Sequence, residues 1–143
     1  MMIVAASPDH FARLAVQEGQ SEEAGLLSPA MAALACASPN EAWAALDGPR
    51  VLGVGGVQPV WAGRAMLWCY LAPAQGAAFV AVHRAVRRFL AGRAERRLEA
   101  VAVCGFAAAH RWLDMLGFDE PPALLRAYTP GGRDAVLRAR VRA

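Results

Sequence analysis

A short apolar run, a helical stripe and a glycine stop follow one another over residues 98–118 and constrain the fold more than any other stretch. Residues 98–103 are mainly apolar, which predicts a strand buried on both faces. From Phe106 the apolar positions recur every three or four residues, the pattern of an amphipathic helix. Gly117 ends this helix because glycine adopts left-handed conformations without a Cβ penalty, and Phe118 returns the chain to the core.

Length and composition predict a single folded domain over residues 1–143. Hydrophobic residues make up 57% of the chain and charged residues 19%, so the sequence has ample core material and is not of the disordered class. The formal charge of +3 comes from arginine, since the chain contains no lysine. The arginines between residues 84 and 97 are interpreted as a solvated helix face, with a basic patch as the alternative, and we expect no nucleic-acid partner.

Targeting and redox features predict a cytoplasmic protein. The long uncharged runs, residues 24–40 and 65–82, are interrupted by prolines and glycine and change their periodicity, so we expect no membrane span. No basic residue precedes Arg13 and no cleavage site follows an apolar core, which argues against a secretory signal. Three cysteines without metal-ligand spacing predict a reducing compartment and no metal site.

The remaining patterns predict an alternating order of strands and helices. Ser7-Pro8 and Ser28-Pro29 are typical helix starts, and Gly53, Gly55 and Gly56 indicate a bulge or a close backbone approach. We expect helices over residues 8–17, 29–37, 77–92 and 106–116, a loop over 19–25, and strands over 2–6, 41–46, 51–60, 65–71, 98–103, 124–128 and 135–141, the last two forming a hairpin. We therefore expect an α/β (α+β) fold.

This order of elements, together with the helix that ends in Leu116-Gly117-Phe118, resembles the GNAT acyltransferase superfamily along nearly the whole chain. The resemblance implies a GNAT-like fold, with a mixed, mostly antiparallel twisted sheet of about seven strands flanked by four helices. In such a fold two neighbouring strands, here over residues 65–71 and 98–103, splay apart and admit the pantetheine arm of acetyl-CoA. The family loop reads Gln/Arg-x-x-Gly-x-Gly/Ala and binds pyrophosphate through the amides of a helix N-terminus. Gln75 matches its first position, whereas Ala78 and Val80 replace the later small residues, and Val80 is expected to narrow the approach. The cofactor-binding residues implied by the resemblance are Tyr70, Leu71, Gln75, Gly76, Ala77, Ala78, Val80 and Leu113.

The catalytic residues of the family are only partly matched. Many members carry a tyrosine four residues ahead of the glycine that ends the last helix, and that position here is Leu113, which has no acidic proton. No carboxylate lies between residues 51 and 71 to act as a general base. The candidates that remain are His110, Glu41 and Tyr128, and the alternative for His110 is a hydrogen-bonded structural histidine. Cys104 has no adjacent base and is interpreted as buried filler.

Two hypotheses from different classes follow. The first is an acetyl-CoA-dependent N-acyltransferase that acts on a small-molecule or protein amine. The second is a non-catalytic binding module, because residues 63–134 also resemble GNAT-fold proteins of tailed bacteriophages, some of which are internal or assembly-associated virion proteins. Under this second hypothesis the partners are other virion or assembly proteins, and the protein resides in the host cytoplasm or the virion.

Overall fold

The computed structural model describes residues 1–25, 27–73 and 76–142. Their elements, in chain order, are β1 (Met2–Ala5), α1 (Pro8–Arg13), the 3-10 turn η1 (Glu18–Gln20), α2 (Ser21–Ala24), α3 (Pro29–Cys36), β2 (Glu41–Asp47), β3 (Arg50–Trp61), β4 (Arg64–Leu71), α4 (Ala77–Ala91), β5 (Arg97–Val103), α5 (Ala107–Met115), β6 (Ala123–Leu125) and β7 (Ala135–Val141). The strands form one sheet in the order β1-β2-β3-β4-β5-β7-β6. The β4–β5 pair is parallel, and the β1–β2, β2–β3, β5–β7 and β6–β7 pairs are antiparallel. The mixed, mostly antiparallel sheet expected from the sequence is therefore confirmed.

The chain divides into two compact units. The first comprises residues 1–58 and 69–93, and the second residues 59–68 and 94 onward. Strands β3 and β4 run through both units. The single domain expected over residues 1–143 stays a prediction.

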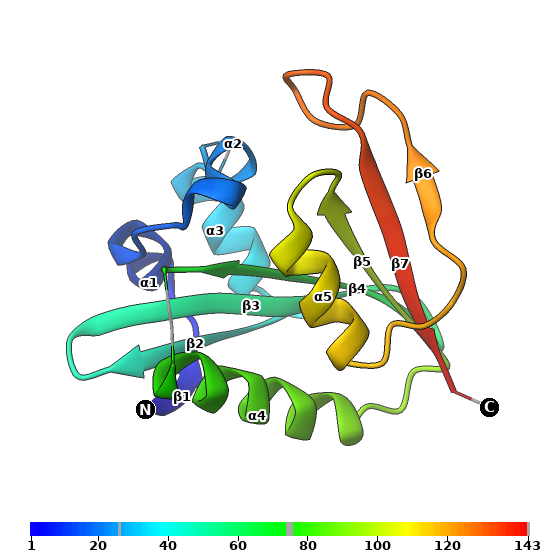
Figure 1. Ribbon diagram of the computed structural model, residues 1–143. Coiled ribbons are helices and arrows are strands. Elements are labelled where there is room, and N and C mark those ends of the chain that lie inside the picture. The colour runs from blue at the N-terminus through cyan, green and yellow to red at the C-terminus, as the bar shows by residue number, and fades with distance from the viewer. Residues whose placement is uncertain (26, 74–75, 143) are drawn as a thin grey trace. The chain divides into compact units, whose positions relative to one another are not determined.

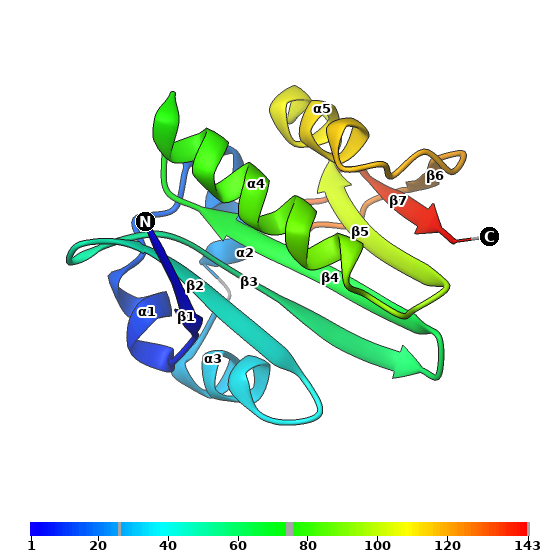
Figure 2. The same ribbon diagram turned by 90° about the horizontal axis from the view of Figure 1, so that it is seen from below.

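The first unit is a layered structure around β1, β2, β3 and the end of β4. Figures 1 and 2 show α4 along one face of these strands and α1 and α3 on the other face. Its buried core includes Leu52, Val54, Val57, Val82 and Leu90. Gly53 lies where β3 and β4 approach closely, because an added Cβ would stand 2.5 Å from Leu71 Cδ2. The close approach expected at the β3 glycines is confirmed at this position.

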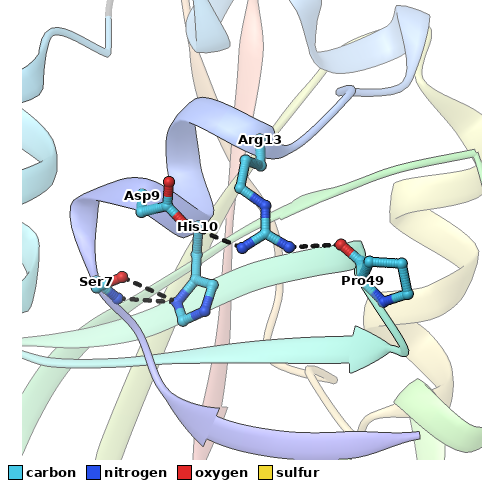
Figure 3. A network of polar contacts seen from close by, with 5 residues as sticks. All are labelled: Ser7, Asp9, His10, Arg13 and Pro49. Atoms are coloured by element: carbon cyan, nitrogen blue, oxygen red, sulfur yellow. Dashed lines mark hydrogen bonds and ion pairs between the residues drawn. The ribbon is translucent and has the colours of Figure 1, made fainter.

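Helix α1 is shorter than the sequence pattern predicts, and the expected loop after it contains η1 and α2. The helix ends at Arg13 rather than near Gln17 because the Gln17 N–H donates to the Leu71 carbonyl at 2.8 Å, outside any helical turn. At the start of α1 the Ser7 N–H donates to His10 Nδ1 at 3.0 Å, and Arg13 donates to Asp9 Oδ2 and to the Pro49 carbonyl, as Figure 3 shows. The helix start at Ser7-Pro8 is confirmed, and its end was set by a tertiary contact.

The second unit contains the start of β4, β5, β7, β6 and α5. Its α5 ends as predicted: Gly117 has a φ of 84°, its N–H donates to the Asp114 carbonyl, and the Phe118 N–H reaches back to the Leu113 carbonyl at 3.0 Å. These are the two bonds of a Schellman motif. Phe118 is 1% exposed and belongs to the core. The first strand of the closing hairpin is shorter than residues 124–128, because the Tyr128 and Thr129 N–H groups both donate to the Arg133 carbonyl and begin a turn.

A buried ion cluster ties β4 to β5 in the second unit. Glu99 is 2% exposed, accepts two hydrogen bonds from Arg64 at 2.9 Å each, and accepts a third from Arg97 at 2.5 Å. The hydrogen bond from Arg64, followed by that from Arg97, holds the pKa of Glu99 below its ordinary value. The paired positions of the two strands are Arg64 with Arg97, Ala65 with Leu98 and Met66 with Glu99. The predicted neighbourhood of these strands is confirmed, and Glu99 stays ionised between them.

In the part of the chain that the structure describes, none of the helices has the length and hydropathy needed to cross a bilayer.

Replacing Gly117 with alanine should destabilise the protein by about 1–2 kcal/mol, because alanine at a left-handed position meets its own carbonyl oxygen. Space is not the cause, since the new Cβ would have Arg140 Nε at 3.8 Å as its neighbour. Gly92→Ala is the matched control, because Gly92 follows α4 with a φ of −87° that alanine adopts freely. Urea unfolding of both variants checks the prediction, and equal midpoints would contradict it.

Replacing Glu99 with glutamine should cost about 1–3 kcal/mol of unfolding free energy at neutral pH, since two guanidinium groups lose their counter-charge. The folded pKa of Glu99 is lowered, so its contribution is complete above about pH 4.3, the ordinary glutamate value, and is lost as the pH falls through the lower folded value. The difference between the wild type and Glu99→Gln should therefore shrink in acid. Unfolding measured from pH 7 down to about pH 3, with the exposed Asp119→Asn as control, tests this; a constant difference refutes it.

Candidate functional site

The candidate site is the connection between β4 and α4 in the first unit. Gly76 is the N-cap of α4 with a φ of 60° and a ψ of −132°, and α4 runs for 15 residues from Ala77. The first amides of a helix have no partner within the helix, and they carry its positive dipole end. Gly76 and Ala77 are exposed and Ala78 is half-buried, and none of the three has a side chain larger than a methyl group. Gln75, predicted at the first position of the loop, lies outside the described residues. An anion could approach this helix end closely.

Val80 stands on the outside of the first turn of α4. Its N–H donates to the Gly76 carbonyl at 3.1 Å, so this amide is used by the helix itself. Its side chain is 43% exposed. Because the side chain is this exposed, Val80 contributes little to core packing. The expected narrowing of the approach to the helix end stays a prediction.

Arg50 adds positive charge to the same connection. It lies at the start of β3, and its Nη2 donates to the Pro73 carbonyl at 2.9 Å, within the segment between β4 and α4. The guanidinium is exposed and keeps further N–H groups beyond the one that this bond uses. Sequence reasoning missed Arg50, because it lies 23 residues ahead of Pro73 and no local motif marks it.

Tyr70 and Leu71, two of the predicted cofactor-binding residues, end β4. Leu71 is 8% exposed and Tyr70 half-buried. The backbone of this strand end is engaged by the segment that follows α1: the Leu71 N–H donates to Gln20 Oε1 at 3.0 Å, and Gln20 Nε2 donates to the Cys69 carbonyl at 2.6 Å. Gln20 is a second residue that sequence reasoning missed.

His110 and Leu113 lie on α5 in the second unit. His110 Nε2 is 3.0 Å from the Val103 carbonyl oxygen, and a carbonyl only accepts, so Nε2 carries the proton of this hydrogen bond. In the neutral ring the lone pair is then on Nδ1. The bond ties α5 to the end of β5 and gives His110 a structural role. Leu113 is half-buried and contributes its carbonyl to the helix end.

Glu41 lies at the opposite end of α4 from Gly76. Its Oε2 pairs with Arg93 Nη1 at 2.5 Å, just beyond the last residue of α4. A helix of this length spans about 22 Å, so Glu41 is far from the amides of the first turn. The ion pair gives Glu41 a structural account, and its catalytic role stays an untested prediction.

Tyr128 and the cysteines complete the predicted set. Tyr128 is 53% exposed on the connection between β6 and β7, and its catalytic role also stays a prediction. Burial raises the pKa of the Cys69 thiol to about 12, so this cysteine is protonated at neutral pH and is a poor nucleophile. Cys104 is half-buried at the end of β5, where its N–H donates to the Asp134 carbonyl at 2.9 Å.

Comparison with solved structures identifies the fold. A ribosomal-protein-alanine N-acetyltransferase from Brucella melitensis matches with a TM-score of 0.71 and 16% identity, over 99% of this chain and 100% of that one. An N-acetyltransferase from Staphylococcus aureus matches with a TM-score of 0.72 and 13% identity, over 98% and 97% of the two chains. A GNAT superfamily phosphinothricin acetyltransferase from Sinorhizobium meliloti, in complex with AcCoA, matches with a TM-score of 0.68 and 18% identity, over 98% and 87%. The GNAT-like fold implied by the sequence resemblance is thus confirmed.

Comparison of the sequence with protein-family models and with curated proteins finds no match.

Substituting His110 separates its structural role from a catalytic one. His110→Ala should lower the unfolding free energy by about 1 kcal/mol through loss of the bond to Val103. His110→Gln should recover part of this loss, because a glutamine amide can donate to the same carbonyl but cannot act as an imidazole base. Any acyl-transfer rate should be the same in both folded variants as in the wild type. A fall of about tenfold or more in both would instead identify His110 as the base.

Proposed function

We propose that this protein is an N-acyltransferase that transfers an acetyl group from acetyl-CoA to an amine. The observation that carries the proposal is the connection from β4 to α4, where an exposed helix N-terminus has small residues and Arg50 of β3 donates to the Pro73 carbonyl. The likeness of the whole fold to N-acetyltransferases, one of them in complex with AcCoA, supports it.

The residues present fit a pyrophosphate group. In the proposal, the amides of Ala77 and Ala78 face the phosphate oxygens, Gly76 leaves their approach open, and the Arg50 guanidinium supplies a fixed positive charge. Among the described residues, none beyond its chain neighbours would lie within 4 Å of a Cβ added at Gly76. Gln75, Tyr70 and Leu71 keep the cofactor-binding roles that the sequence resemblance implies.

The chemistry then depends on positioning. Acetyl-CoA supplies an acetyl group already activated as a thioester. The chain contributes a binding surface that holds this group and the amine together, which by itself lowers a barrier by several kcal/mol, roughly 7–11 in well-oriented cases. Leu113 offers no acidic proton, and His110 Nε2 is engaged with Val103, so the departing thiolate takes its proton from solvent in this proposal. Slow turnover is the expected consequence.

The alternative is a non-catalytic module with virion or assembly partners. None of the contacts within the described ranges favours it over the acyltransferase, and it therefore serves as the contrary outcome of the binding test. The acceptor in the proposal is a small-molecule or protein amine.

Calorimetry with acetyl-CoA tests the proposal. The wild type should bind acetyl-CoA, and ADP, which shares the pyrophosphate, should bind more weakly. Arg50→Gln should weaken both ligands by about three- to tenfold, because the anion loses one charged donor at a partly exposed site. Arg126→Gln, an exposed arginine of the second unit, is the matched control and should change neither. Absence of any acetyl-CoA binding at millimolar concentration would reject the enzyme in favour of the module.

A further inference from the structure

The last residues of β4 present one edge of their backbone to a side chain rather than to another strand. Successive residues of a strand direct their N–H and C=O groups to alternate sides. The Ala72 N–H donates to the Leu52 carbonyl of β3 at 2.9 Å, so the groups of Leu71 and Cys69 face away from β3. On that side they meet Gln17, just before η1, and Gln20, the last residue of η1.

Gln20 binds this edge as a neighbouring backbone amide would. Its Nε2 donates to the Cys69 carbonyl at 2.6 Å and its Oε1 accepts from the Leu71 N–H at 3.0 Å. Gln17 reinforces the contact twice: its N–H donates to the Leu71 carbonyl at 2.8 Å, and its Nε2 donates to Gln20 Oε1 at 2.9 Å. One carboxamide thus occupies a carbonyl and an N–H two residues apart, the pair that a β-strand offers to an incoming amide.

The segment that carries Gln20 is weakly anchored elsewhere. Elements η1 and α2 are three and four residues long, and neither contains a buried residue. Glu23 Oε2 is buried and has no hydrogen-bond partner among the described residues, and a buried acceptor without a partner costs free energy while the segment stays in this position. Segments with few buried contacts open at a small free-energy cost. The hydrogen bonds to β4 are therefore a main contribution to the stability of this segment's position.

We propose that Gln20 is an autoinhibitory strap that occupies the amide-binding edge of β4 and must leave it before acetyl-CoA binds fully. This inference rests on the proposed function. The pantetheine arm of acetyl-CoA carries two secondary amides, so it competes with the Gln20 carboxamide for Cys69 and Leu71. The edge lies directly ahead of the segment that leads to Gly76 and α4, where the pyrophosphate is proposed to bind. Only molecules with the strap open bind acetyl-CoA fully, so the apparent affinity equals the affinity of the open form multiplied by the fraction of molecules that are open.

Removing the carboxamide tests the strap. Gln20→Met keeps most of the side-chain volume without an amide, and Gln20→Ala is a second variant in case methionine disturbs the fold. Both should bind acetyl-CoA about tenfold more tightly than the wild type, because two hydrogen bonds no longer have to be exchanged. ADP has no pantetheine arm, so its affinity should stay unchanged. Gln58→Met, at an exposed position of β3 in the same unit, is the control and should change neither ligand.

Amide hydrogen exchange gives a second readout that is independent of calorimetry. The Leu71 N–H should exchange faster in Gln20→Met than in the wild type, and saturating acetyl-CoA should slow it again in the variant. Stronger binding by the folded variants, confined to acetyl-CoA, supports the strap. If the wild type binds acetyl-CoA and both folded variants bind it with equal or weaker affinity, the strap is overturned and the proposed function stays intact. The same conclusion follows if the affinity for ADP rises as much as the affinity for acetyl-CoA. No acetyl-CoA binding by the wild type or by either variant overturns both proposals.

Discussion

The backbone at the end of β4 is the element on which the first unit depends. On one side the Ala72 N–H donates to the Leu52 carbonyl of β3. At Gly53 an added Cβ would stand 2.5 Å from Leu71 Cδ2 and 3.1 Å from the Tyr70 carbonyl oxygen, so glycine lets the two strands approach closely. On the other side the Leu71 backbone is held by Gln17 and Gln20. These contacts end α1 early, because the Gln17 N–H that would extend the helix is committed to β4. The position of the α4 start follows from the same strand end, since only a short segment separates them.

The second unit depends on a different interaction, the buried carboxylate of Glu99. An ionised group is costly to bury unless it is paired and fully hydrogen-bonded, and Arg64 and Arg97 satisfy both conditions. Arg64 Cζ also lies 4.5 Å from the centroid of the Trp61 ring, a cation–π contact that adds to the two hydrogen bonds with Glu99. The cluster joins residues on β4 and β5 at the start of both strands and fixes their register there.

The proposed site combines permissive geometry with little chemistry of its own. Small residues at the start of α4, and Arg50 bound to Pro73 in the segment before it, suit an anionic ligand. The catalytic candidates, by contrast, are held in structural contacts: His110 by Val103 and Glu41 by Arg93. An acyltransferase with such a site works mainly through the placement of its substrates. Control of access to the strand edge by Gln20 would then matter as much as any proton transfer, because binding geometry is what such an enzyme supplies.

The sequence by itself determined the elements that depend on local physics. Periodicity located α4, α5 and the strands, the serine-proline pairs located the starts of α1 and α3, and Gly117 determined how α5 ends, because each of these signals lies within a few residues of the structure that it specifies. Tertiary structure alone decided the end of α1, the burial of Glu99, and the roles of Arg50 and Gln20. In sequence, Arg50 and Pro73 are separated by 23 residues, Glu99 and Arg64 by 35, and Gln20 and Leu71 by 51. No local pattern encodes a contact over such separations, since it exists only after the strands have paired and brought the two segments together.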